Sequence, residues 1–305
     1  MTEGGFARDM RPRMIATILG AVAPVLLTAL LGYGWTRSGR SFDAPTLTLL
    51  VSDIGTPCLI FSTYIHAQIP PAAFAATAAA ACAIIAAFFV VMGAVLRAAG
   101  LNLRTYLPSM VFGNTGNLGI PLALYAFGPE GLGYAIVFVT ITSICNFTLG
   151  QGIAAGAVDW RAVARMPLIY AVAAGIAASQ LGVALPRWLE TTVALLGNMA
   201  VPLMLLLLGA SLGQLKVAAL PRAAALSCLR IGMGAGVGFA VTTLFGLQGL
   251  AKDALVQQSA MPVAVFNYLF ALRYDNSPEE IAGIVVVSTL LAILTTPLLL
   301  ALLLG

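Results

Sequence analysis

The chain has 305 residues, of which 60% are hydrophobic and only 9% are charged, and its mean hydropathy is +1.00. This composition excludes an ordinary soluble domain and indicates a protein that crosses a membrane many times. A formal net charge of +4 would suggest a nucleic-acid partner for a soluble protein, but here it reflects basic loops, so we expect no nucleic acid and a lipid bilayer as the surroundings.

Apolar runs of about 20 residues, the length that crosses a bilayer as a helix, recur along the chain. They predict an all-α membrane protein with ten transmembrane helices, at 14–33, 45–66, 72–96, 105–127, 132–153, 167–185, 189–213, 221–246, 252–271 and 280–304. The first run follows Arg8, Arg11 and Arg13, as a signal peptide would. Its apolar part is too long for one and no small-residue cleavage site follows, so we expect a retained helix.

Basic residues in the connections predict the orientation. Five lie on the side of the amino terminus, namely Arg8, Arg11, Arg13, Arg187 and Lys252. Nine lie on the other side, namely Arg37, Arg40, Arg97, Arg104, Arg161, Arg165, Lys216, Arg222 and Arg273. The excess places both termini outside a bacterial-type inner (plasma) membrane and the 154–166 connection in the cytoplasm, although the arginines before the first span oppose this orientation.

The fourth predicted span contains an interruption that an ordinary transmembrane helix does not tolerate. It lies in an uncharged run and combines helix-weakening residues, namely Gly113, Asn114, Gly116, Asn117, Gly119 and Pro121. Irregular backbone at membrane depth occurs where protein buries it or where it lines a watery cavity. The interruption therefore predicts the substrate site of a transporter.

Prolines repeat across the two halves of the chain. Pro57 precedes Pro121 by 64 residues, and Pro202 precedes Pro262 by 60. These prolines fall in spans two, four, seven and nine, so the period is five spans. Because five is odd, the second copy enters the membrane from the opposite face, which predicts an inverted repeat. We expect one five-helix repeat at 1–153, the connection at 154–166 and the second repeat at 167–305.

Residues 114–128, NTGNLGIPLALYAFG, resemble the fourth-helix signature of the auxin efflux carrier family of permeases. The likeness extends over nearly the whole chain, through the ten spans, the short central loop, Pro57, Pro202 and the second break at 259–262. That family is part of a larger group that includes bile-acid-type sodium symporters, in which spans four and nine are broken helices that cross.

This resemblance implies secondary transport of small organic anions, such as auxin-like monocarboxylates or malonate-like dicarboxylates. It also implies a homodimer, with spans 1, 2, 6 and 7 as a scaffold and the other spans as a moving transport domain. The two broken helices would cross at the membrane midplane.

The chemistry of the breaks suits an anion independently of the family. Half-helices that begin at a break point free N–H groups and positive dipole ends into the cavity. Asn114, Asn117, Gln258 and Ser259 add side-chain donors, so a carboxylate could be held without an Arg or Lys partner. Two alternatives stay open: the amide oxygens could hold sodium, or the amides could only satisfy carbonyls freed by the breaks.

Three further amides are candidate substrate contacts. Asn146 and Gln151 lie in the fifth span, and Asn267 follows the second break. Each could face the cavity, or could hydrogen-bond between helices instead.

Ionisable residues inside spans are candidate functional residues by default. Asp53 could carry a coupling proton, and Arg230 lies within the eighth span, although both could reach the membrane interface. His66, the single histidine, ends the second span and is read as an interface residue with a lesser case for a proton role.

These observations predict a secondary transporter that carries small organic anions by elevator-type alternating access, with its site between the breaks. No Walker, H-E-x-x-H or C-x-x-C motif occurs, so we expect no enzyme, no catalytic residues, no cofactor and no metal site. The alternatives are a sodium-coupled symporter of the same architecture, and a membrane receptor or enzyme that transports nothing. Coupling to protons, sodium or voltage is left open.

Overall fold

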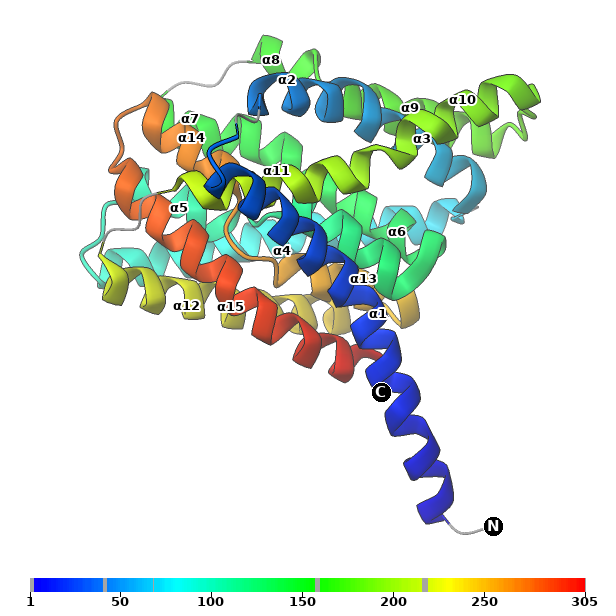
Figure 1. Ribbon diagram of the computed structural model, residues 1–305, viewed down its shortest axis with the longest axis horizontal. Helices are drawn as coiled ribbons and strands as arrows, with labels where there is room; N and C mark the ends of the chain where they lie inside the picture. The colour runs from blue at the N-terminus through cyan, green and yellow to red at the C-terminus, as the bar shows by residue number, and fades with distance from the viewer. Residues whose placement is uncertain (1–2, 41–42, 68, 157–159, 216–218, 305) are drawn as a thin grey trace.

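The computed structural model describes residues 3–40, 43–67, 69–156, 160–215 and 219–304, and within these ranges every regular element is helical (Figure 1). The first half contains α1 (Glu3–Arg37), α2 (Ala44–Leu49), η1 (Leu50–Gly55), α3 (Thr56–Ala67), α4 (Pro71–Ala98), α5 (Leu103–Val111), η2 (Thr115–Gly119), α6 (Ile120–Cys145), η3 (Asn146–Gly150) and α7 (Gln151–Ala155). The second contains α8 (Trp160–Ala164), α9 (Pro167–Gln180), α10 (Arg187–Asn198), α11 (Ala200–Gln214), α12 (Leu220–Leu244), α13 (Gly249–Ser259), α14 (Val265–Arg273) and α15 (Pro278–Leu304).

Seven stretches of the described chain are long and apolar enough to cross a membrane. They are Leu19–Arg37, Ala44–His66, Pro71–Ala98, Thr115–Ala155, Arg187–Gln214, Leu220–Leu244 and Pro278–Leu304. The helix that contains the first stretch begins at Glu3, earlier than predicted, and its amino-terminal turns project from the bundle (Figure 1). The protein is therefore an all-helical, multi-pass membrane protein, and the number ten stays a prediction.

The helices pack in two sets. In one set α1 lies along α11, and α3 contacts α9 and α10. In the other set α12 contacts α13 and α15, while α4 contacts α5. Helix α6 packs against α13 and α4 and also against α1 and α3, so it connects the two sets.

Glycines let α1 and α11 approach until their backbones touch. A side chain at Gly32 would overlap the backbone of Leu206, and one at Gly209 would overlap the carbonyl of Ala29. Small residues at such crossings allow the close van der Waals packing that holds transmembrane helices together. Gly34, also in α1, has no neighbouring atom within 4 Å of the position a side chain would take.

The two interrupted segments contact each other. The first lies between α5 and η2, and the second between α13 and α14. Gly113 and Val263 form an isolated antiparallel bridge, in which the Asn114 N–H donates to the Pro262 carbonyl at 2.6 Å and the Ala264 N–H to the Phe112 carbonyl at 3.3 Å. We call residues 112–114 and 260–264, with the helix ends that flank them, the crossing.

Pro57 and Pro202 interrupt their spans less than the two non-helical segments of the crossing do. Pro57 follows the π-helical turn η1 and lies in the first turn of α3, which continues to Ala67. Pro202 lies just after Met199, the one residue between α10 and α11. Pro262 lies inside the non-helical segment between α13 and α14, next to the bridge residue Val263. Pro121 instead lies in the first turn of α6, and η2 separates it from the non-helical residues 112–114.

Candidate functional site

Helix ends of both polarities meet at the crossing. The amino-terminal ends of η2 and α14 and the carboxyl-terminal ends of α5 and α13 border the paired segments. The first N–H groups of a helix have no acceptor inside it, and this end carries partial positive charge. The crossing therefore brings together the positive ends of η2 and α14 and the negative ends of α5 and α13. Some of these end groups are paired locally, since the Thr115 N–H donates to the Gly113 carbonyl at 2.8 Å.

The start of η2 combines such donors with unpaired amides. Asn114 is 5% exposed, and its Nδ2 has no hydrogen-bond acceptor in the described chain. Asn117 is half-buried, and no side-chain hydrogen bond is found for it within the described residues. Gly116, between them, has open space where a side chain would project. This end of η2 therefore combines amide donors with space beside Gly116.

Gln258 and Ser259 are the last two residues of α13, but their side chains differ in hydrogen bonding. Gln258 is fully buried, and neither its Oε1 nor its Nε2 has a partner among the described residues. Its carboxamide lies against Gly119, where any side chain would collide with it. Ser259 Oγ instead lies 2.9 Å from the Gly234 and Val256 carbonyl oxygens, so its donor holds α13 against α12.

Asn146, Gln151 and Asn267, the three candidate amides of the later spans, also differ in their hydrogen-bond partners. Asn267 joins the crossing, because its Nδ2 donates to the Phe112 carbonyl at 3.0 Å while its Oδ1 has no described partner. Asn146 is 6% exposed and its Oδ1 likewise lacks one. Gln151 donates from Nε2 to the Tyr274 hydroxyl at 3.0 Å, which links α7 to the end of α14.

Arg230 corrects the expectation that the site contains no positive charge. The residue is 1% exposed, and its Nη1 donates to the Ser259 carbonyl at 2.8 Å. It therefore does not reach the membrane interface, which was one reading of its sequence position. The reason is tertiary: α12 packs against α13, and this contact turns Arg230 toward the crossing.

Gln257 is a buried polar residue of the crossing that sequence reasoning missed. It is fully buried, its Nε2 lies 3.5 Å from Met261 Sδ, and its Oε1 has no partner in the described chain. The signal was present, since Gln257, Gln258 and Ser259 form a polar run before the second break. Gln258 is singled out because it lies four residues before Pro262, as Asn117 lies four residues before Pro121, and this spacing passes over Gln257.

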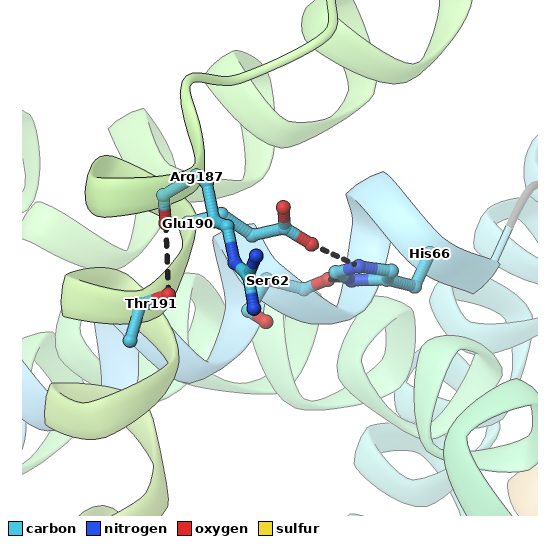
Figure 2. Close-up of polar contacts among 5 residues, drawn as sticks. All are labelled: Ser62, His66, Arg187, Glu190 and Thr191. Carbon is cyan, nitrogen blue, oxygen red and sulfur yellow. Dashed lines mark hydrogen bonds and ion pairs between the residues drawn. The ribbon is translucent and has the colours of Figure 1, made fainter.

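Asp53 and His66 lie apart from the crossing. Asp53 is exposed on η1, where the Ser52 hydroxyl donates to its Oδ1 at 3.0 Å, and η1 packs with α2, α3 and α9 to α11. His66 Nε2 lies 3.1 Å from Glu190 Oε1, and its Nδ1 lies 2.7 Å from the Ser62 carbonyl oxygen (Figure 2). The half-exposed His66–Glu190 pair joins α3 to α10.

A separate cavity of about 100 Å³ lies between α3, α4 and α9. Its lining consists of Tyr64, Ile69, Pro71, Phe74, Ile176, Ser179 and Gln180. None of these residues belongs to the crossing, and most of the lining surface is apolar. Its chemistry gives a small carboxylate few polar partners, so the crossing is the better candidate site.

Apolar helices, paired breaks and unpaired buried amides define a multi-pass membrane protein of the transporter class. The profile of the membrane transport protein family matches residues 17–156 and 153–300. The chain belongs to this family, the auxin efflux carrier-like family whose signature residues 114–128 resemble.

Two archaeal proteins are similar to the chain. One, described as an uncharacterized transporter of Methanothermobacter thermautotrophicus, is 26% identical over 292 residues, which cover 91% of this chain and 95% of that protein. The other, an uncharacterized transporter of Methanocaldococcus jannaschii, is 28% identical over 201 residues, which cover 62% of this chain and 64% of that protein. Both similarities agree with membership of a transporter family.

Proposed function

We propose that the protein is a secondary transporter of small organic anions, such as auxin-like monocarboxylates or malonate-like dicarboxylates. The observation that carries the proposal is the start of η2, a helix end with partial positive charge. Asn114 Nδ2 has no acceptor among the described residues there, Asn117 is half-buried, and no atom lies within 4 Å of the position that a side chain at Gly116 would take. The side-chain amides of Asn114 and Asn117 can donate hydrogen bonds, and a carboxylate accepts them.

We further propose ten membrane spans in two inverted five-helix repeats, with the broken fourth and ninth spans crossing at the midplane. The stretch Thr115–Ala155 has 41 residues, which as one helix would measure about 62 Å, roughly twice the bilayer core. Gly128 bends it with φ 68° and ψ −169°, a conformation open mainly to glycine, so the stretch supplies parts of two spans. Helix α9 and the α13–α14 pair supply the other two.

Elevator-type movement is the proposed mechanism. Helices α1 to α3 and α9 to α11 would form the scaffold, and the remaining spans would carry the crossing across the membrane. Contacts of η2 with α11 support this division, because they put the proposed anion site next to the scaffold. Movement of one set past the other would then expose the site to each side in turn.

The proposed location is a bacterial-type inner membrane, with both termini external, as the loop charges favour. The connection that would be cytoplasmic, 154–166, includes residues 157–159, which lie outside the described residues. A homodimer is proposed from the family resemblance.

A sodium-coupled symporter of the same architecture is the second candidate. One observation favours it: Gln257 Oε1, Gln258 Oε1, Asn146 Oδ1 and Asn267 Oδ1 are buried oxygens with no partner in the described chain. Oxygen atoms of this kind are the ligands that hard cations prefer.

Uptake by purified protein in proteoliposomes tests the proposal. We expect accumulation of a labelled indole monocarboxylate or of malonate, and competition by unlabelled carboxylates but not by the matching carboxamides. Assays in sodium chloride and in choline chloride, at two pH values, separate the two candidates. Absence of uptake and of carboxylate-induced thermal stabilisation for all members of a carboxylate panel would contradict the proposal.

The candidate proton role of Asp53 gives a direct prediction. Asp53→Asn is nearly isosteric and removes only the titrating group, so the variant should lose the pH dependence of uptake while retaining carboxylate binding. Ser52→Ala, which removes the hydrogen bond to Asp53 and leaves the carboxylate, serves as the control. Unchanged pH dependence in Asp53→Asn would assign the carboxylate to its local contact with Ser52.

A further inference from the structure

Arg230 is a buried cation for which the described part of the chain supplies no carboxylate partner. The ion pairs found in the described chain are His66–Glu190 and Arg222–Glu280, and neither involves Arg230. Its guanidinium carbon lies 4.9 Å from the centroid of the Phe88 ring, and its Nε has no hydrogen-bond partner among the described residues. A buried charge is costly unless something of opposite sign compensates it.

Backbone carbonyls provide that compensation. The last carbonyls of a helix lack partners inside the helix and carry partial negative charge, and Arg230 Nη1 donates to the carbonyl of Ser259, the last residue of α13. A methyl group placed on Gly113 would lie 2.5 Å from Arg230 Nη2 and 2.9 Å from the Met261 carbonyl oxygen, so both atoms border the space that a side chain there would take. Gly113 has no side chain, which leaves room for this arrangement.

Carbonyl oxygens gathered at a helix end are also how proteins hold dissociable alkali cations. We propose that Arg230 is the built-in cation of the crossing: its guanidinium occupies the place beside the carbonyl end of α13 where a sodium ion would otherwise bind. A second cation there would be repelled by the first. Transport is then independent of sodium, and this last consequence alone rests on the proposed function.

Thermal unfolding of purified protein tests the inference without a transport assay. Wild type, Arg230→Ala and Arg222→Ala are compared in chlorides of sodium, choline and methylguanidinium at equal ionic strength. Arg222→Ala is the matched control, because it removes an arginine of the same helix that is half-exposed and paired with Glu280 at 2.9 Å. Wild type should unfold at the same temperature in sodium and choline. Arg230→Ala should unfold at a lower temperature and gain a saturable rise of about 5 °C from methylguanidinium, the size expected for a ligand near saturation.

Two results would overturn the inference. One is saturable stabilisation of wild type by sodium over choline; the other is a methylguanidinium response of Arg230→Ala no larger than that of Arg222→Ala. Should Arg230→Ala not be recovered folded, the yields of folded Arg230→Lys and Arg230→Gln decide, since only lysine keeps the charge. We expect a higher yield for lysine, and equal yields would contradict the inference. Failure of the proposed function would show separately, as absence of carboxylate uptake with the cation results unchanged.

Discussion

Asn117→Ala is expected to lower the affinity for the transported carboxylate by about tenfold to a hundredfold, because a hydrogen bond to a charged group contributes roughly 1.5–3 kcal/mol. Asn117 is half-buried in η2 beside the open space at Gly116, and no side-chain hydrogen bond is found for it within the described residues. Its loss should therefore cost little stability, with an unfolding temperature within about 2 °C of wild type. Carboxylate-induced thermal shift and uptake competition measure the affinity.

Asn117→Asp distinguishes an anion contact from a cation ligand. The change is nearly isosteric and puts a negative charge at the amino-terminal end of η2, so carboxylate affinity should fall further than in Asn117→Ala. If the amide oxygen instead held sodium, Asn117→Asp would strengthen sodium binding. Gln214→Ala, which removes an exposed amide at the end of α11, should change neither. Normal carboxylate binding with lower thermal stability in Asn117→Ala would make the amide a cap for the backbone, and Gln258 would become the next residue to test.

Gly32→Val is expected to lower the unfolding temperature by about 2–6 °C, from roughly 1–3 kcal/mol of overpacking. The added side chain would overlap the backbone of Leu206, so α1 and α11 must separate along their contact. Backbone atoms cannot move aside as a flexible side chain can.

Gly34→Val is the control on the same helix. Position 34 is exposed and has no atom within 4 Å of a new side chain, so the unfolding temperature should stay near that of wild type. Valine there also removes the helix-destabilising effect of glycine, which favours the helix slightly. Equal effects at the two positions would show that α1 and α11 do not depend on this close approach.

Much of the fold was accessible from the sequence because the bilayer imposes strong length and polarity constraints. Apolar runs predicted helices throughout the chain, and the described elements are helical. The glycines and Pro121 predicted an interruption over 113–121, but only 112–114 are non-helical, with Gly113 in the bridge to Val263. Gly116 and Gly119 lie in η2 and Pro121 lies in α6, because the chain resumes a helix at Thr115. The signature at 114–128 indicated the family, which the profile match shows. The repeat, the ten spans and the roles of the site residues stay predictions.

Other features depended on which helices pack together. The π-helical turns at η1, η2 and η3 have no distinct sequence signal, and the bend at Gly128 resembles any glycine in an apolar run. Ser259 and Gln258 are adjacent in sequence, yet Ser259 Oγ donates to a carbonyl of α12 while the Gln258 carboxamide has no partner among the described residues. Hydrogen-bond partners far apart in the sequence decided this difference.

The sequence by itself therefore determined the class of protein, the family and the presence of an interruption near Gly113, because each follows from local composition and backbone propensity. Only the tertiary structure decided that the breaks pair through Gly113 and Val263, and that Arg230 lies at their side. The guanidinium of an arginine near the middle of an apolar span can either extend to the membrane interface or bind a partner inside the protein. The packing of α12 against α13 brought the Ser259 carbonyl within reach and so selected the second.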